Sequence, residues 1–376
     1  MRFHVSQRRA RVLELLRERG QTQVTELAEE LGVSVVTLRR DVEALAADGK
    51  VERLHGAVLW PGVPEPAVAA DDLVIGMVVP TTGYYYADVL RGAREVVEAH
   101  GARLTVGLTH YLPGEDATQA ERLLAGGAEG LLLTPAWETG APAAGEGAWI
   151  AELGPPTVLV ERSAPPGHPA AALDRVRSDH AHGAAEAVSH LAGLGHTKIA
   201  LAIQTSPTSH ALRVGYRAAV DSLGLKDAPP SPLDSAPSHT ESDRFDRTLG
   251  YLRDAVEKHG VTAALVQSDS DAIVLVPRLL ARGIRVPQDL AVVAYDDEVA
   301  GLADPPLTAV APMKRDVGAR AAELLLARIA AGRTGAGTTT TTPVAAQHID
   351  VMPELRVRAS SGRQVDGRAA QVGEHQ

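Results

Sequence analysis

The feature that most restricts the fold is a regular alternation of apolar runs with amphipathic segments, beginning at Leu73. Eight runs have the apolar content of buried strands: 73–80, 103–108, 130–135, 157–161, 175–178, 198–203, 263–267 and 290–295. Segments with helical periodicity separate them, at 87–100, 116–125, 181–194, 212–223, 244–259, 270–282 and 315–330. This order is typical of βαβ units and a parallel sheet. Because the region spans about 270 residues, we expect an α/β body of two lobes.

The first sixty residues carry a different pattern. Helical periodicity predicts one helix at about 7–19 and a second that ends at Leu31, with Thr22 or Thr25 as its N-cap. A turn at Gly32 then leads into a third helix. The pattern predicts a small helical domain in front of the body.

The third helix has one apolar face and one polar face. Ser34 is suited to cap it, and four residues at spacings of three and four face the other helices: Val35, Leu38, Val42 and Leu45. Because each residue turns the helix by 100°, Val36 and Arg40 lie on the opposite face, with Thr37 and Arg39 on its flanks. Arg40 is therefore expected to enter a DNA major groove. The alternative is a solvated helix face, with Arg39 and Arg40 paired to Asp41 or Glu43.

Two strand-like segments at 50–54 and 57–60 follow, joined by a tight reversal at His55 and Gly56. Such a wing places Lys50, Arg53 and His55 near phosphates or the minor groove. The stretch resembles the DeoR-type winged helix-turn-helix in its motifs ELAEELGVS, TLRRDVEAL and GKVERLHGA. The resemblance implies that Ser34, Thr37, Arg39 and Arg40 lie at double-stranded DNA, with Arg53 and His55 in the wing. A winged helix that binds protein is the alternative.

Charge is distributed unevenly along the chain. The net charge is −10, yet residues 1–60 hold ten Arg and Lys against nine Asp and Glu, so the rest carries −11. Arg8, Arg9 and the basic residues of the third helix and wing could share one face. The absence of cysteine excludes thiol nucleophiles and cysteine metal sites. Without an apolar run of eighteen residues or a signal-peptide core, a cytoplasmic protein that does not enter a membrane is expected.

The body resembles the sensor domain of the LacI family, which shares the type I periplasmic-binding-protein fold. The motifs are IGMVVP, GAEGLLLTP, PPTVLVERS, LGHTKIALA, VPQDLAVVAYDD, DPPLTAV and PELRVRAS. We therefore expect an α/β chain: a winged helix-turn-helix at 1–60, a Pro-rich linker at 61–72, a two-lobed sensor at 73–360 and a disordered tail at 361–376. Residues 332–346 are low in complexity and are expected to form a flexible loop.

Candidate ligand contacts follow the strands, because ligands of parallel sheets bind beyond the carboxyl ends of the strands. Tyr84, Tyr85 and Tyr86 could stack on a sugar ring, or could pack on the lobe surface. The resemblance places a ligand-binding carboxylate at Asp269, which could instead cap a helix. Thr134 and Arg162 also follow strands.

Two further candidates are less regular. Asp179 is either a ligand contact or a helix cap. Many LacI relatives have an arginine three residues before a Gly-aromatic pair, but here Leu212 holds that place and Arg213 follows it, before Gly215 and Tyr216. The loop or the ligand is therefore expected to differ from those of the relatives.

The sequence predicts a DNA-binding transcriptional regulator, a repressor by resemblance, acting as a homodimer controlled by a sugar or sugar derivative. A nucleoside or purine effector, or a sugar-processing enzyme with a regulatory head, are the alternatives. Walker, G-x-S-x-G and H-E-x-x-H motifs are missing from the sequence, and the acidic run at Asp269 and Asp271 lacks the glycine and distal glutamate of a calcium loop. We therefore expect no catalytic residue, metal or cofactor.

Overall fold

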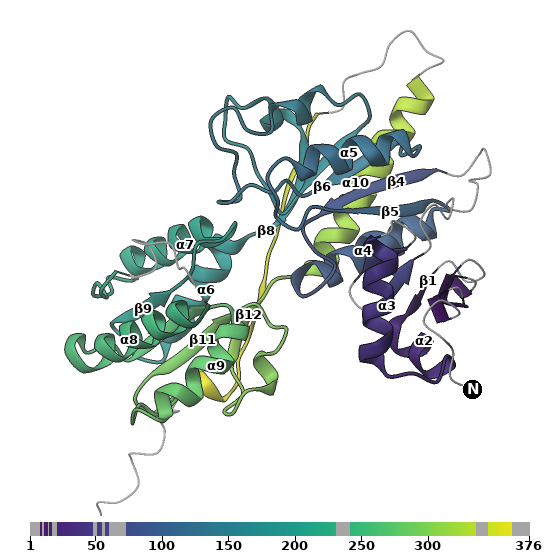
Figure 1. Ribbon diagram of the computed structural model, residues 1–376. Helices are drawn as coiled ribbons and strands as arrows, with labels where there is room; N and C mark the ends of the chain where they lie inside the picture. The colour runs from purple at the N-terminus through teal and green to yellow at the C-terminus, as the bar shows by residue number, and fades with distance from the viewer. Residues whose placement is uncertain are drawn as a thin grey trace, which may run out of the picture. The chain divides into compact units, whose positions relative to one another are not determined.

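The computed structural model describes residues 8–9, 11–13, 15–16, 21–47, 51–54, 57–59, 73–230, 241–335 and 345–362. The chain forms two compact units, a head at 1–72 and a body at 73–376 (Figure 1). The expected linker at 61–72 and all of the expected tail beyond Gly362 lie outside the described residues.

In the head, α2 (Val24–Glu30) and α3 (Val35–Ala47) pack with helical residues between 8 and 16. Their buried core is continuous, and includes Val12, Leu16, Leu27, Leu38, Val42 and Leu45. The expected wing is present as β2 (Glu52–Leu54) and β3 (Ala57–Leu59). A third strand, β1 (Gln21–Gln23), pairs with β3 and was not predicted from the sequence. Only a helix N-cap at Thr22 was expected there. Thr22 pairs with Val58 in this sheet, so α2 begins only at Val24.

The first lobe of the body, lobe 1, is a parallel sheet in the order β13-β8-β7-β6-β4-β5. Its strands are β4 (Val74–Val79), β5 (Arg103–Leu108), β6 (Gly130–Leu133), β7 (Thr157–Val160), β8 (Asp174–Ser178) and β13 (His348–Val351). Its helices are α4 (Tyr85–Ala99), α5 (Glu115–Ala125) and α10 (Lys314–Gly335), with short turns η1 (Ala148–Glu152) and η2 (Pro169–Ala172). Residues 332–335 continue α10 and are not the expected loop, and 336–344 lie outside the described residues.

The second lobe, lobe 2, has the strand order β14-β12-β11-β10-β9, in which only β14 is antiparallel. Its strands are β9 (Ile199–Ala202), β10 (Ala263–Gln267), β11 (Ala291–Tyr295), β12 (Thr308–Ala311) and β14 (Glu354–Arg356). Its helices are α6 (His180–Gly193), α7 (Ser209–Ser222), α8 (Glu241–His259) and α9 (Asp269–Leu280), with η4 (Ala300–Leu302) and η5 (Ala359–Ser361). The expected two-lobed α/β architecture is confirmed.

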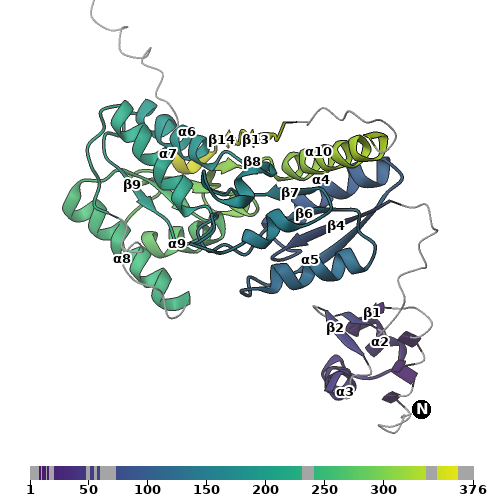
Figure 2. The same ribbon diagram turned by 90° about the horizontal axis from the view of Figure 1, so that it is seen from above.

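The chain passes between the lobes three times: from β8 to α6, from β12 to α10, and from β13 to β14 (Figure 2). Each lobe is therefore assembled from separate stretches of sequence. Because β8 and α6 are joined through residue 179 alone, the carboxyl ends of the lobe 1 strands lie close to lobe 2.

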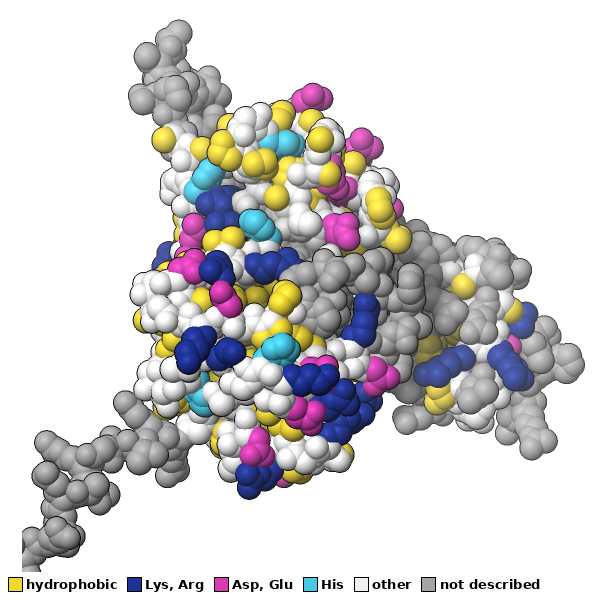
Figure 3. Space-filling view, turned by 90° about the vertical axis from the view of Figure 1, so that its left-hand side faces the viewer, with side chains coloured by type: hydrophobic (Ala, Val, Ile, Leu, Met, Phe, Trp, Pro, Cys, Tyr) yellow, Lys and Arg dark blue, Asp and Glu magenta, His cyan; other side chains and the backbone are white. Residues whose placement is uncertain are grey.

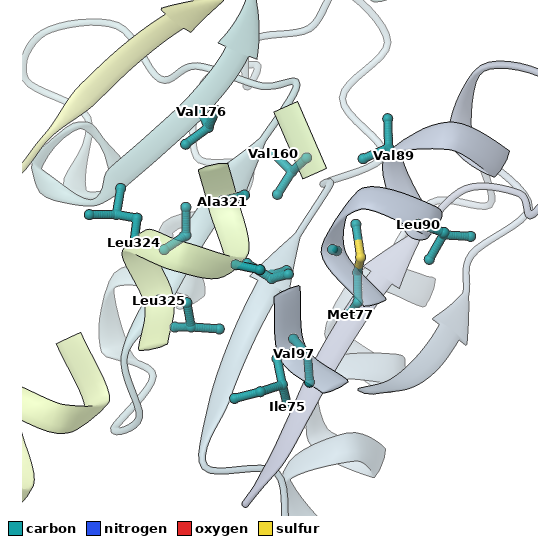
Figure 4. Packing of buried hydrophobic residues seen from close by; sticks show 14 of the residues in the cluster. Ile75, Met77, Val89, Leu90, Val97, Val160, Val176, Ala321, Leu324 and Leu325 are labelled. Carbon is teal, nitrogen blue, oxygen red and sulfur yellow. The ribbon is translucent and has the colours of Figure 1, made fainter. Parts of the chain in front are cut away.

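Buried aliphatic side chains from α4, α10 and the sheet fill the core of lobe 1, among them Ile75, Met77, Val97 and Leu325 (Figure 4). The two helices touch through glycine: a Cβ at Gly92 would lie 1.9 Å from the carbonyl oxygen of Arg315. Without side chains at this contact, α4 and α10 approach closely enough to close one face of the sheet.

Candidate functional site

The polar face of α3 is organised by its first turn. The hydroxyl of Ser34 accepts a hydrogen bond from the backbone N–H of Thr37 (3.2 Å) and lies 2.8 Å from the Thr37 hydroxyl. This is the expected N-cap, which satisfies a backbone donor that the helix leaves without a partner. Ser34 is exposed and Thr37 is half-buried.

Asp41 fixes the rotation of α3 about its axis. Its carboxylate is buried, and it pairs with Arg8 Nε at 2.5 Å and with Arg9 Nε at 3.1 Å. The expectation that Arg8 shares a DNA-facing surface is therefore wrong, because Arg8 is itself buried at this ion pair. Because Asp41 pairs with Arg8 and Arg9, it is not the surface partner of Arg39 and Arg40 that the sequence offered as an alternative.

Arg39 and Arg40 are exposed on α3, as the helical phase predicts. Leu38 and Val42, on the opposite side of the helix, are completely or almost completely buried. The side chains of Val36 and Arg53, and the whole of His55, lie outside what the structure describes. Their expected roles at DNA remain predictions, as do those of Ser34, Thr37, Arg39 and Arg40.

The surface of the body mixes charges of both signs. Basic and acidic side chains are interspersed over the face shown in Figure 3. Exposed ion pairs, such as Arg217 with Asp221 (2.8 Å) and Arg285 with Asp289 (2.7 Å), bring opposite charges together on the body.

A cavity of about 280 Å³ lies between the two lobes. Lobe 1 lines it with Tyr84, Tyr85, Tyr86, Tyr111, Glu161 and Arg162, and His180 lines it from the start of α6. Lobe 2 contributes residues 204–208, Gln267, Ser268, Ser270, Asp271 and Asp296. Tyr84, Tyr85, Tyr86 and Arg162 were singled out from the sequence, and all four lie in the wall.

Glu161 anchors the lobe 1 wall. Its carboxylate accepts hydrogen bonds from the hydroxyls of Tyr85 (2.6 Å) and Ser178 (2.9 Å), and lies 3.5 Å from His180 Nε2. Burial raises the pKa of Glu161, but the hydrogen bonds from His180 and Tyr85 outweigh it, so the pKa is lowered to about 2. The sequence pattern did not single out this acid, although it is the last residue of the predicted strand at 157–161 and precedes Arg162.

Arg162 is a buried cation, 2% exposed. Its Nε donates to the carbonyl of Pro135 (2.8 Å), and Nη1 donates to the carbonyl of Glu161 (2.8 Å) and to the Tyr86 hydroxyl (3.3 Å). Among the described residues, nothing accepts a hydrogen bond from the buried Nη2. A buried donor without a partner is expensive, so this nitrogen is suited to a ligand oxygen.

Gln267 holds a matching group in lobe 2. Its Nε2 donates to the hydroxyls of Ser206 (3.0 Å) and Thr208 (2.7 Å). The buried Oε1 accepts no hydrogen bond from the described part of the chain. Each lobe thus contributes to the cavity wall a residue with one buried polar atom that lacks a partner, a donor in Arg162 and an acceptor in Gln267.

Asp296 is one of two buried acids that lobe 2 contributes to the wall, the other being Asp271. Asp296 follows β11 with φ of 71°, a left-handed conformation that is uncommon for residues other than glycine. Burial raises its pKa to about 6; Lys314 and His180 oppose this shift, whereas Asp269 and Glu298 add to it. Lys314, which forms an ion pair with Glu298, also stands 5.2 Å above the Tyr85 ring.

Four other candidates, Thr134, Asp179, Asp269 and Arg213, do not line the cavity. Thr134 is completely buried behind the wall. Asp179 caps α6, because its carboxylate accepts the N–H of His182 at 2.9 Å. Asp269 is completely buried and is held by lobe 2, with its Oδ2 accepting the N–H groups of Val299 (2.6 Å) and Ala300 (2.9 Å).

The fourth candidate, Arg213, lies on α7 outside the cavity wall. Leu212, which stands where the resemblance leads one to expect an arginine, is completely buried in the lobe 2 core. Gly215 fixes this arrangement, because a Cβ there would lie 1.8 Å from the carbonyl oxygen of Ala181. Because α7 packs closely on α6, the side chain of Leu212 points into the core of lobe 2 and not into the cavity.

Within the described part of the chain, no three His, Asp or Glu side chains are grouped closely enough to hold a metal ion. The helices described there are too short or too polar to cross a membrane. These two findings do not bear on the ligand of the cavity. The polar groups of the cavity wall determine which ligand fits.

Comparisons with known proteins found matches to both the head and the body. A DeoR-like helix-turn-helix domain matches residues 8–61, and a periplasmic binding protein-like domain matches residues 188–361. The chain is 24% identical over 311 residues to the arabinose metabolism transcriptional repressor of Geobacillus stearothermophilus, covering 81% of this chain and 83% of that protein. It is 25% identical over 356 residues to the HTH-type transcriptional regulator DegA of Bacillus subtilis, covering 90% and 98%. The structure of transcription regulator GntR from Chromobacterium violaceum aligns with a TM-score of 0.60 and 26% identity, over 77% of this chain and 99% of that one.

Proposed function

We propose that this chain, which is a DNA-binding transcriptional regulator with a DeoR-like helix-turn-helix head and a LacI-type sensor body, is a cytoplasmic repressor controlled by a sugar. The name of its arabinose-metabolism relative supports a sugar as the effector. The sugar binds and is not consumed, so the body acts as a sensor and not as an enzyme.

One observation carries the choice of effector. Arg162 and Gln267 both line the cavity, and each has one buried polar atom, Nη2 and Oε1 respectively, without a hydrogen-bond partner among the described residues. A sugar hydroxyl both donates and accepts, so a polyhydroxylated ring satisfies the two groups together. Tyrosine rings in the same wall offer flat apolar surfaces to the faces of such a ring.

The size of the cavity supports a small effector. At about 280 Å³ it lies near the lower end of the range for small-molecule pockets, roughly 300–1,000 Å³. Its polar groups come from both lobes, so a ligand that contacts both stabilises the closed arrangement over an open one. That difference in affinity is what effector control requires.

In the head, α3 enters the major groove with Arg40 at base edges, while Arg39, Thr37 and Ser34 contact phosphates or outer bases. Val36 faces the groove, and Arg53 and His55 contact the DNA from the wing. Two heads in a homodimer read two half-sites, and sugar-induced closure of the bodies changes the spacing of the heads. Phosphate contacts make the affinity fall steeply with salt.

The test is a sugar panel applied to the full chain, with melting temperature, calorimetric affinity and sugar integrity measured together. We expect at least one sugar to raise the melting temperature without being consumed, and to release selected operator DNA. Arg162→Gln should abolish the shift, whereas Arg217→Gln, which removes an exposed arginine of the body, should leave it intact. Binding of nucleosides or purines in place of sugars, or turnover of the sugar, contradicts the proposal.

A further inference from the structure

We propose that Tyr84 is a latch between the lobes, which holds the sensor partly closed before the effector binds. The inference rests on the proposed function for its regulatory meaning, but the latch itself is a hydrogen bond between two side chains of the body. Tyr84 lies in lobe 1, immediately before α4. Its hydroxyl donates to Asp269 Oδ1 of lobe 2 at 2.5 Å and lies 3.5 Å from Asp296 Oδ2.

The acceptor of the latch is rigid. Asp269 is completely buried, and its second oxygen accepts the N–H groups of Val299 and Ala300. A hydrogen bond from a hydroxyl to a buried carboxylate is short and stronger than one between neutral groups. Tyr84 as a whole residue is 42% exposed, so its side chain is not packed into either core when the hydroxyl reaches this fixed point in lobe 2.

The backbone of Tyr84 indicates that the contact is held under strain. Its φ of 49° and ψ of −126° place a bulky residue in a region that residues other than glycine rarely occupy. Such strain persists only where other interactions impose it. The hydrogen bond to Asp269 is the contact that directs this side chain away from lobe 1.

The latch is compatible with a bound effector. With the hydroxyl on Asp269, a cavity of about 280 Å³ remains open beside the Tyr84 ring. The effector therefore meets lobes that are already close together. Because apparent affinity scales with the fraction of protein in the binding-competent state, the latch raises the sensitivity of the sensor.

The latch is also connected, through Asp269, to an exposed segment of lobe 2. Asp269 holds the start of η4, whose Leu302 is 79% exposed. Opening the latch leaves Asp269 with only the two backbone donors of this segment. Closure of the cavity is thereby linked to the position of η4.

The experiment measures the distance between the lobes without any sugar. The chain has no cysteine, so spin labels can be placed at Glu121→Cys on α5 and Ala218→Cys on α7, both of which are exposed. In the full chain, Tyr84→Phe should lengthen and broaden the distance distribution. Tyr251→Phe is the matched control, because it removes a hydroxyl that donates to Pro229 within lobe 2 at 2.8 Å.

Tyr84→Gly is a second variant, which removes the latch and also relieves the backbone strain, so it remains informative if Tyr84→Phe folds poorly. A sugar-free distance distribution in both Tyr84 variants that equals that of Tyr251→Phe overturns the latch. With arabinose as the probe, Tyr84→Phe should weaken binding about tenfold, as expected for losing one hydrogen bond to a charged acceptor. If no sugar binds but the variants open, the latch stands and the sugar proposal fails.

Discussion

Replacing Asp296 with asparagine should stabilise the body at neutral pH and have little effect in acid. Burial raises the pKa of Asp296 from its ordinary value of 3.8 to about 6. Because a tenfold change in proton affinity corresponds to about 1.36 kcal/mol, holding this carboxylate ionised in the folded body costs roughly 3 kcal/mol. Asparagine has nearly the same shape and tolerates the left-handed backbone at this position (φ of 71°), so the substitution removes the charge with little change in packing.

The pH dependence follows from the direction of the shift. Because the folded protein binds a proton at Asp296 more tightly than the unfolded chain does, its stability is fully present below about pH 4 and declines as the pH rises through 6. Asparagine does not titrate. The free energy of unfolding of Asp296→Asn minus that of the wild type should therefore grow by roughly 3 kcal/mol between pH 4 and pH 8.

Urea denaturation of both proteins at pH 4.5, 6 and 8 measures this difference, with tryptophan fluorescence and circular dichroism as separate probes. A constant offset between the two proteins reports packing and does not bear on the charge. A difference that fails to grow with pH, or a variant that is less stable at pH 8 than at pH 4.5 relative to the wild type, would refute the reasoning. The same variant should bind the effector more weakly, because the acid is kept in the cavity wall despite its effect on stability.

Three further substitutions test the packing and the head. Gly92→Ala should destabilise the body by about 1–3 kcal/mol or more, since its Cβ would meet the Arg315 carbonyl at 1.9 Å; thermal melting of the body reports it. Asp41→Ala removes the buried carboxylate that pairs with Arg8 and Arg9 and should destabilise the head by about 3–5 kcal/mol, which loss of operator binding at unchanged sugar affinity would reveal. Arg40→Ala should weaken binding to selected operator by about 1–3 kcal/mol and relax its sequence preference; an unchanged selection disproves the helix phase.

Periodicity was sufficient to predict the two-lobed body, because strands buried on both faces appear as continuous apolar runs. It failed for β13, whose residues HIDV are partly exposed and half polar, and which is a strand only because β8 offers it an edge. It also failed for β1, three polar residues that pair with β3, for example Thr22 with Val58, far away in the sequence. Pairing partners of this kind are set by tertiary structure and leave little local signal.

In the candidate site, too, some residues could be predicted from local sequence and others depend on tertiary contacts. Tyr84, Tyr85 and Arg162 could be found because the carboxyl ends of parallel strands mark the cavity edge. The role of Asp269 could not, since its Oδ2 is taken by backbone groups some thirty residues away at Val299 and Ala300, and its Oδ1 by the hydroxyl of Tyr84. Whether an acid faces a ligand or its own backbone depends on such distant contacts.

The threefold passage of the chain between the lobes has a consequence for synthesis. Lobe 1 gains its edge strand β13 and lobe 2 its β14 only when residues 348–356 have been made. The head, complete by residue 59 in its described part, leaves the ribosome nearly three hundred residues earlier. Translation that stops before residue 348 therefore yields a DNA-reading domain attached to a body that cannot close its sheets, and such a product would occupy operators without answering to any metabolite.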